Sequence, residues 1–146
     1  MTSTSRSTRS NLKTLPWKNL DSQPELDFSA DTMRRQLRQW MQDCRQQTID
    51  LFTELNETTF RHHAHPDFSP VGWHLGHIGY TESLWLLEHL AQQPCRFPQY
   101  RRLYAADGLP KSERVHLPTL PETLAYLNAI RQPVLDYLDI APIAEQ

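Results

Sequence analysis

The most informative part of the chain is residues 69–87, which read SPVGWHLGHIGYTESLWLL. Ser69 and Pro70 are typical of a helix start, because a Ser side chain caps exposed backbone N–H groups and Pro is tolerated in the first turn. The apolar and aromatic residues that follow predict a helix that continues to about Leu90. Three Gly residues weaken this helix and allow a neighbouring helix or a ligand to approach closely.

The two histidines of this stretch are candidate metal ligands. His74 and His77 are three residues apart, so a helix places both on one face, and imidazoles that project into a bundle interior commonly bind metals. The pair alone favours a structural interpretation, a partly buried His bonded to a backbone carbonyl beside an exposed His. We expect His77 to face the inside of a bundle, on a broad arc that comprises Val71, His74, Leu75, His77, Ile78, Thr81 and Trp85.

A second helix is predicted before this stretch, over residues 31–55. Ser29 or Asp31 can cap its start, and no Gly or Pro interrupts it. Its apolar residues recur at three- and four-residue steps, as on one face of a helix: Met33, Leu37, Trp40, Met41, Cys44, Thr48, Leu51, Phe52 and Leu55.

A third helix is predicted over residues 119–139. Thr119 followed by Glu122 has the spacing of a capping box, and Pro133 is expected to kink the helix near Ala129. Its apolar stripe consists of Leu120, Leu124, Leu127, Ile130, Val134 and Leu138. With no credible pair of strands, the sequence predicts an all-α fold.

The connection between the second and third of these helices along the chain, residues 93–118, shows no sustained period. Such long connections are usually functional or mobile. Lys111 and Arg114, with Arg101 and Arg102 upstream, are candidates to bind substrate carboxylates, because the forked guanidinium group matches carboxylate geometry. The residues alone favour the alternative, a loop whose basic side chains serve solubility.

Other residues with metal or redox chemistry have simpler interpretations. His62, His63 and His65 precede the histidine-bearing helix, and a solvated polar turn with incidental metal affinity explains them. Cys44 and Cys95 have no zinc-site spacing, so two idle thiols are favoured over one disulfide.

Composition limits the remaining function classes. A chain of 146 residues is long enough for one domain with its own core. Its 15 basic and 17 acidic residues nearly balance, so the total charge does not indicate binding to nucleic acid or to an anionic membrane. No run approaches the roughly 18 apolar residues that span a bilayer. We therefore expect a cytoplasmic protein.

The chain divides into three expected parts: a disordered, basic, Ser/Thr-rich tail over residues 1–27, a helical domain over residues 28–140, and a C-terminal tail over residues 141–146. A transit peptide is the alternative for the first tail, but no apolar face accompanies its basic residues.

Two segments of the chain are similar to a known family of helical domains. The run from Phe68 to Leu87, centred on Trp-His-Leu-Gly-His-Ile-Gly, resembles the second helix of the DinB-like domain in ergothioneine-biosynthesis sulfoxide synthases, the hercynine oxygenase family. Residues 102–104 and 114–121 are similar to the family's next segment, and the resemblance covers roughly residues 33–138. It implies a DinB-like up-down helical bundle with three long helices present and the fourth missing.

The resemblance also implies residue roles. His77 matches the first of three histidines that bind a non-haem Fe(II), and His74 is a weaker candidate because the family also accepts an acidic residue there. Arg114 matches a basic residue that pairs with the carboxylates of the thiol substrate. Lys111 stands where some members carry a second Arg, and a Lys gives up bidentate pairing, which weakens the case for an identical thiol.

The main departure from the family is that no H-x-x-x-H pair, the other two iron ligands, follows His116. A second domain that resembles the formylglycine-generating enzyme is also absent. We therefore expect no tight iron binding and no catalysis by this chain alone, since such sites use three protein ligands. We favour the N-terminal portion of a sulfoxide synthase, which joins hercynine to a cysteine-containing thiol. A split enzyme completed by a partner chain and a noncatalytic interaction module remain open.

Overall fold

The computed structural model describes residues 29–143, which are helical or irregular and include no strand. The all-α fold class is therefore confirmed within this range. The predicted tail of residues 1–27 lies outside the described residues, as do residues 144–146. The helical segments are α1 (Ala30–Asp50), α2 (Glu57–Arg61), α3 (Val71–Glu82), the π-helical η2 (Ser83–Leu90), α4 (Pro98–Tyr104), the 3₁₀ turn η3 (Lys111–Glu113) and α5 (Leu120–Ile140).

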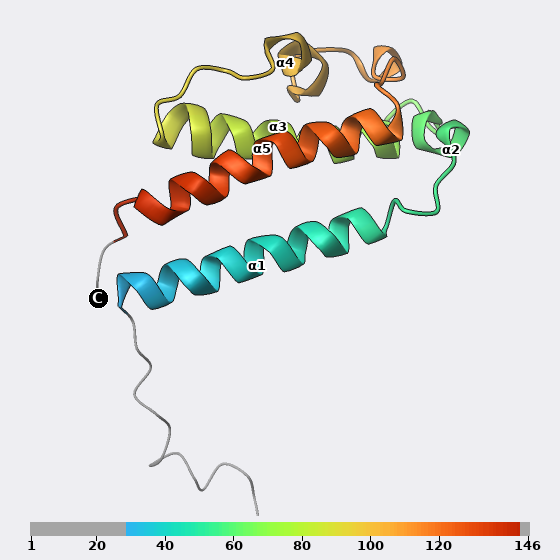
Figure 1. Ribbon diagram of the computed structural model, residues 1–146. Coiled ribbons are helices and arrows are strands. Elements are labelled where there is room, and N and C mark those ends of the chain that lie inside the picture. Colours follow the sequence, from blue (N-terminus) through green and yellow to red (C-terminus); the bar gives the residue numbers. More distant parts are fainter. Residues whose placement is uncertain (1–28, 144–146) are drawn as a thin grey trace, which may run out of the picture.

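The long segments differ in direction (Figure 1). α3 and its continuation η2 run in the same direction as α5, and α1 runs the opposite way. The ends agree with this arrangement, since Arg34 near the start of α1 donates a hydrogen bond of 2.9 Å to the carbonyl oxygen of Ala141, just after α5. Because α3 and α5 are parallel, the chain must return between them, and residues 91–119 form that return along α3.

Three short elements were not predicted from the sequence. α2 lies between α1 and α3, and α4 and η3 lie within the return segment that showed no period. A helix of five or seven residues completes at most about two turns, so it leaves no repeat that a periodicity argument can detect.

α1 begins as predicted and ends earlier. Ser29 caps its start through its side-chain oxygen. The helix ends at Asp50, so the prediction that it continues to Leu55 is wrong, and the intervening residues form a turn. That turn places Phe52 against Phe60 of α2, with the ring centroids 6.3 Å apart. Packing against α2 therefore overrides the local helical pattern.

α3 begins one residue later than predicted, at Val71, and Pro70 is its N-cap residue without a side-chain cap. The predicted cap, Ser69, has a different partner: its Oγ accepts a hydrogen bond of 3.0 Å from Nη1 of Arg114. The segment ends at the predicted Leu90, but its last part is the π-helical η2 rather than an α-helix.

The face of α3 that enters the core differs from the predicted arc. Val71, His74 and Ile78 are exposed, and Trp85 in η2 is 61% exposed. Of the arc, only Leu75 is buried, and His77 is half-buried. The buried face consists mainly of Gly72, Trp73, Leu75, Gly76 and Gly79, because glycines let the neighbouring elements come closest. Most side chains of this arc are therefore exposed, while His77 is partly buried.

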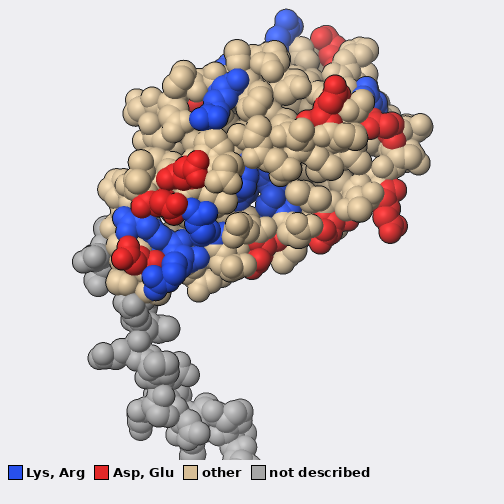
Figure 2. Space-filling model, in the orientation of Figure 1, with Lys and Arg blue, Asp and Glu red and all other residues tan. Residues whose placement is uncertain are grey.

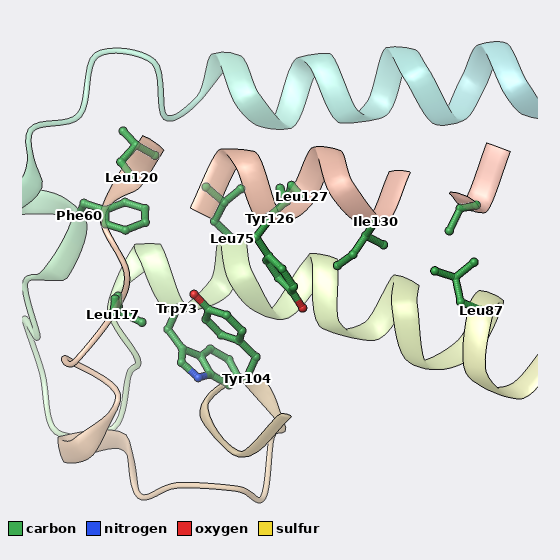
Figure 3. Packing of buried hydrophobic residues seen from close by; sticks show 11 residues of the cluster. Phe60, Trp73, Leu75, Leu87, Tyr104, Leu117, Leu120, Tyr126, Leu127 and Ile130 are labelled. Carbon is green, nitrogen blue, oxygen red and sulfur yellow. The ribbon is translucent and has the colours of Figure 1, made fainter. Parts of the chain in front are cut away.

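The core lies between α3, η2 and α5, and α2 and α4 close it (Figure 3). Tyr104 of α4 is fully buried, and a Cβ atom at Gly76 would lie 2.1 Å from its ring, so Gly76 is required for α4 to pack this closely. The core residues are Phe60, Trp73, Leu75, Leu87, Tyr104, Leu117, Leu120, Tyr126, Leu127, Ile130 and Val134.

α5 follows the prediction closely. Thr119 and Glu122 form the capping box, in which the Glu122 carboxylate accepts the Thr119 backbone N–H at 2.7 Å. The helix continues through Pro133 to Ile140. Four members of its predicted stripe are buried: Leu120, Leu127, Ile130 and Val134.

The sequence predicted that no segment spans a membrane and that the two cysteines are not paired. None of the helices in residues 29–143 combines the length and apolar character that a bilayer crossing requires. Both Cys44 and Cys95 are free thiols, as expected.

Candidate functional site

The side chain of His77 has a defined orientation on α3. Its Nδ1 lies 2.7 Å from the backbone carbonyl oxygen of Tyr104. Because a carbonyl oxygen only accepts hydrogen bonds, this contact assigns the proton of a neutral ring to Nδ1 and leaves the lone pair on Nε2. Nε2 forms no hydrogen bond to any other residue in the range 29–143.

This geometry agrees with both interpretations of the histidine pair, the structural one and the metal-ligand one. His77 is the partly buried histidine bonded to a backbone carbonyl, and His74 is the exposed one. The same bond is also the usual way in which proteins orient a metal-binding imidazole, with one ring nitrogen anchored and the other presented to the metal. The anchoring bond is thus compatible with a ligand role and does not by itself establish one.

The aromatic ring of Trp73 packs against His77. The two rings stack with centroids 4.7 Å apart and planes 13° apart. Trp73 is itself anchored, because its Nε1 donates a 2.6 Å hydrogen bond to the carbonyl oxygen of Leu103. Leu103 and Tyr104 are the last residues of α4, where backbone carbonyls lack partners within the helix. The end of α4 therefore orients two side chains of α3.

His74 contributes less to this arrangement. Its exposed ring meets the Trp73 ring edge-on, with centroids 5.2 Å apart. Partial desolvation lowers the pKa of the His74 imidazole, and the nearby charges of His77 and Arg114 lower it further. A neutral His74 is favoured, which is the form that can bind a metal.

Arg114 lies on the same Trp73 ring, with its guanidinium carbon 4.2 Å from the ring centroid. The residue is 7% exposed, and each of its three nitrogens donates one hydrogen bond. The acceptors are the carbonyl oxygens of Leu109 and Ala106 and the hydroxyl of Ser69. Within the described residues Arg114 has no carboxylate partner, so its positive charge is not neutralised.

Lys111 is exposed, and its hydrogen bond goes to a residue other than Trp73. Its Nζ donates a 2.5 Å hydrogen bond to the carbonyl oxygen of Asp67. The structure therefore brings His74, His77 and Arg114 together around Trp73, whereas Lys111 of η3 contacts the loop that precedes α3.

The donor set does not complete a metal site by itself. Among residues 29–143, no three His, Cys, Asp or Glu side chains are grouped so that they could hold a metal ion. The loop histidines His62, His63 and His65 form no such group; His62 and His65 are exposed, whereas Nε2 of His63 is buried without a hydrogen-bond partner.

Sequence reasoning missed the parts of this site that position the other residues. Trp73 precedes His77 by one helical turn, a spacing that indicates ring contact, and this signal was available. The carbonyl groups of Leu103 and Tyr104 left no signal, because the short α4 was not predicted and a backbone carbonyl has no sequence signature.

Comparison with known proteins identifies similar chains. The model of the DinB superfamily matches residues 41–144. The hercynine oxygenase of Mycolicibacterium thermoresistibile is 36% identical over 115 residues, which are 75% of this chain and 25% of that protein. The hercynine oxygenase of Mycolicibacterium smegmatis is 36% identical over 102 residues, 67% of this chain and 24% of that protein. The chain thus spans about a quarter of the length of these relatives.

Proposed function

The chain belongs to the DinB superfamily, and on this basis we propose that it is the N-terminal DinB-like portion of a non-haem Fe(II)-dependent sulfoxide synthase. The similarity to two hercynine oxygenases supports this reaction class. The proposed reaction joins hercynine to a cysteine-containing thiol through a carbon–sulfur bond and a sulfoxide. In that enzyme, His77 is one iron ligand.

The observation that carries the proposal is the orientation of His77. Its Nδ1 is held by the Tyr104 carbonyl, its ring is held by Trp73, and Nε2 has no partner in residues 29–143. These contacts fix the neutral tautomer whose Nε2 lone pair can bind a metal.

One imidazole does not hold iron tightly, because sites of this type use three protein ligands and keep positions open for O₂ and substrate. The described residues contain no group of three donors. We therefore propose that two further ligands come from a helix outside these residues, in the same protein or in a partner chain. By itself the chain then binds iron weakly and does not catalyse.

The surface around His77 supports this arrangement. Val71 and Ile78 of α3 and Trp85 of η2 are exposed apolar residues on the same broad arc as His77. Apolar residues that share one exposed helix face are typical of a surface that packs against another element. The proposed ligand-bearing helix is the occupant of this face.

Arg114 is the proposed partner of a substrate carboxylate. Its three internal hydrogen bonds leave two of the five guanidinium N–H groups, and its charge has no carboxylate partner in residues 29–143. A buried guanidinium fixed in this way is pre-organised for an anionic group. Lys111, exposed and singly bonded to Asp67, is the weaker candidate.

A chimera tests the proposal directly. The segment of the Mycolicibacterium thermoresistibile hercynine oxygenase that aligns with this chain is replaced by the corresponding residues of this chain. We expect the chimera to retain iron after desalting and to form sulfoxide from hercynine and a thiol. Replacing His77→Gln should weaken iron binding by at least about tenfold, since it removes a direct ligand. His74→Gln, three residues away, is the matched control and should retain iron.

Two results contradict the proposal. A folded His77→Gln chimera with the same iron content as its parent removes the ligand assignment. Stoichiometric iron retained by the isolated 146-residue chain overturns the statement that it needs ligands from elsewhere.

The alternative function is a noncatalytic helical interaction module or a split-enzyme subunit. The exposed Trp85 and its apolar neighbours favour an interaction surface in either case. A chimera that folds yet binds no iron, with or without His77, favours the noncatalytic module.

A further inference from the structure

Three charged side chains meet between α1, α3 and α5, separately from the contacts of His77. Arg45 of α1 and Arg131 of α5 both donate hydrogen bonds to Oε2 of Glu82 in α3, the latter at 2.8 Å. Arg131 also donates to the carbonyl oxygen of Met41 at 2.6 Å. The side chains of Arg45, Glu82 and Arg131 are 6%, 9% and 15% exposed. The cluster is thus an interior ion-pair network that links three helices.

The charges of this cluster do not balance. Two guanidinium groups share one carboxylate, which leaves a net charge of +1 in a largely buried place. Burial lowers the pKa of the Arg45 guanidinium, Glu82 opposes that shift, and the second positive charge on Arg131 adds to it. Arginine nevertheless stays protonated in proteins, so the surplus charge persists.

Hydrogen bonding is incomplete in the same place. Arg45 Nη1 and Arg131 Nε are buried and have no hydrogen-bond partner, and Glu82 Oε1 also lacks one. A buried charged N–H group without an acceptor costs free energy comparable to its desolvation. An anion beside the two guanidinium groups would supply the missing negative charge.

A cleft of about 390 Å³ lies against these arginines, between α1 and α5. Figure 2 shows basic side chains in a hollow between these two helices. The two guanidinium groups, two aliphatic side chains and four amide side chains line the cleft, and no carboxylate is among them. The amide side chains are those of Gln42, Gln46, Asn128 and Gln132. The lining is therefore positive and polar, although the amide groups of Gln46 and Gln132 already donate hydrogen bonds to Asp50 and Asp136.

We propose that the cleft between α1 and α5 binds a small anion, a carboxylate or phosphate compound with a polar body, through Arg45 and Arg131. The guanidinium groups bind the anionic group, and the amide side chains bind the polar body. The volume suits a small molecule, at the lower end of the range for ligand pockets. This site does not depend on the proposed iron chemistry, since it shares none of its residues.

The experiment uses the full 146-residue chain and inorganic phosphate as the probe. Phosphate is titrated at constant ionic strength, with chloride as the balancing ion, and Tm and calorimetric binding are measured. We expect Tm to rise with phosphate and one phosphate to bind per chain, because a ligand that binds only the folded state stabilises it. Sodium acetate in a parallel titration distinguishes a carboxylate site from a phosphate site.

Two variants locate the site. Arg131→Gln leaves a one-to-one pair of Arg45 and Glu82, removes the surplus charge, and should weaken phosphate binding by at least about tenfold. Asn128→Trp leaves the ionic cluster intact and fills the cleft, so it should abolish the response even if Arg131→Gln fails to fold. Ala125→Trp is the matched control, exposed on the same helix and outside the cleft, and should respond as the wild type does.

The outcomes are distinct. Equal responses of the wild type and of Asn128→Trp identify an adventitious ion only and overturn the proposal. No response of the wild type to phosphate or to acetate overturns it as well.

Discussion

Single residues determine the geometry around Trp73. Its ring packs against the imidazole of His77 and the guanidinium of Arg114, and its own N–H group is anchored on α4. Each of these three side chains therefore has its orientation fixed by a hydrogen bond to a backbone carbonyl. A proposed ligand and a proposed substrate-binding residue are thus held on one aromatic surface before any ligand binds.

Arg114 should be important for stability as well as for binding. Replacing Arg114→Met removes three hydrogen bonds from a buried guanidinium and leaves their acceptors unpaired, so we expect a loss of about 2–3 kcal/mol in the free energy of unfolding. Chemical denaturation followed by circular dichroism measures this. Arg102→Met is the control, because Arg102 is exposed and donates one long bond of 3.4 Å, and it should change stability by no more than about 0.5 kcal/mol. Equal losses in the two variants would contradict the buried role of Arg114.

Tyr104 predicts a dependence of stability on alkaline pH. Burial raises the pKa of its phenol to about 12, although the nearby Thr123 side chain opposes the shift. The folded state therefore holds this proton more tightly than the unfolded state, whose ordinary pKa is about 10. Stability from this group is complete below pH of about 10 and is lost as the pH rises toward 12.

The variant Tyr104→Phe tests this dependence. It should lose less stability than the wild type between pH of about 10 and 12. At pH 7 it should be as stable as the wild type or more so, because the buried Tyr104 hydroxyl has no hydrogen-bond partner. Unfolding by urea at a series of pH values provides the comparison, and parallel alkaline profiles for the two proteins would refute the expectation.

At the scale of secondary-structure elements, the contact between α3 and α4 positions the candidate site. The carbonyls at the end of α4 can reach Trp73 and His77 only because α3 presents a glycine to the ring of Tyr104. The glycines of α3, which weaken it as an isolated helix, are therefore compensated by the close packing that they allow.

Gly76→Ala should disturb this contact. The new Cβ would lie 2.1 Å from the fully buried Tyr104 ring, which cannot move into solvent, so we expect a loss of about 1–3 kcal/mol in stability. The bond between His77 and the Tyr104 carbonyl should also weaken, which nitrogen NMR of the imidazole detects as a change in tautomer.

Gly79→Ala is the matched control on the same helix. Its Cβ would meet the edge of the Tyr126 ring at 3.0 Å, a milder conflict, and the gain in helix propensity of up to about 1 kcal/mol offsets part of it. A smaller loss for Gly76→Ala than for Gly79→Ala would contradict the close-packing argument.

At the scale of the whole molecule, α1 is attached differently from the other long helices. α3, η2 and α5 share an apolar core, whereas the single buried residue of α1 is Arg45. Met41 of α1 is partly buried and packs against the core, and the polar links of α1 are Arg45 to Glu82, Arg131 to the Met41 carbonyl, and Arg38 to α5. The ionic cluster therefore supplies the only fully buried contact of α1 within the described residues, beside the partly buried Met41.

Glu82→Gln should consequently loosen α1. It leaves two buried guanidinium groups without a carboxylate, and breaking a buried ion pair in this way costs about 3–5 kcal/mol. Amide hydrogen exchange should show faster exchange in α1 than in α5. Glu88→Gln is the control, because its partner Arg101 is 46% exposed and such pairs contribute less than about 1 kcal/mol. Similar exchange rates in both variants would show that α1 does not depend on the cluster.

Much of the fold was predictable from the local sequence. A smaller part of the candidate site was predictable in the same way. The capping box at Thr119 and the end of η2 at Leu90 depend on residues close in sequence and were predicted correctly, and Ser29 was one of the two predicted caps of α1. His77, Arg114 and Lys111 were identified as candidates through their residue types and the family resemblance. Their roles as ligand and substrate-binding residues stay predictions.

By itself, the sequence determined the helical class of the chain, the extent of its long helices to within a few residues, and the residues to which chemistry could be assigned. These properties follow from hydrogen bonds and side-chain preferences that act within one or two turns. The tertiary structure alone decided which face of α3 is buried, where Arg114 finds its acceptors, and that two arginines share one glutamate. Those outcomes depend on how closely separate helices can approach, and that distance is set by partners far away along the chain.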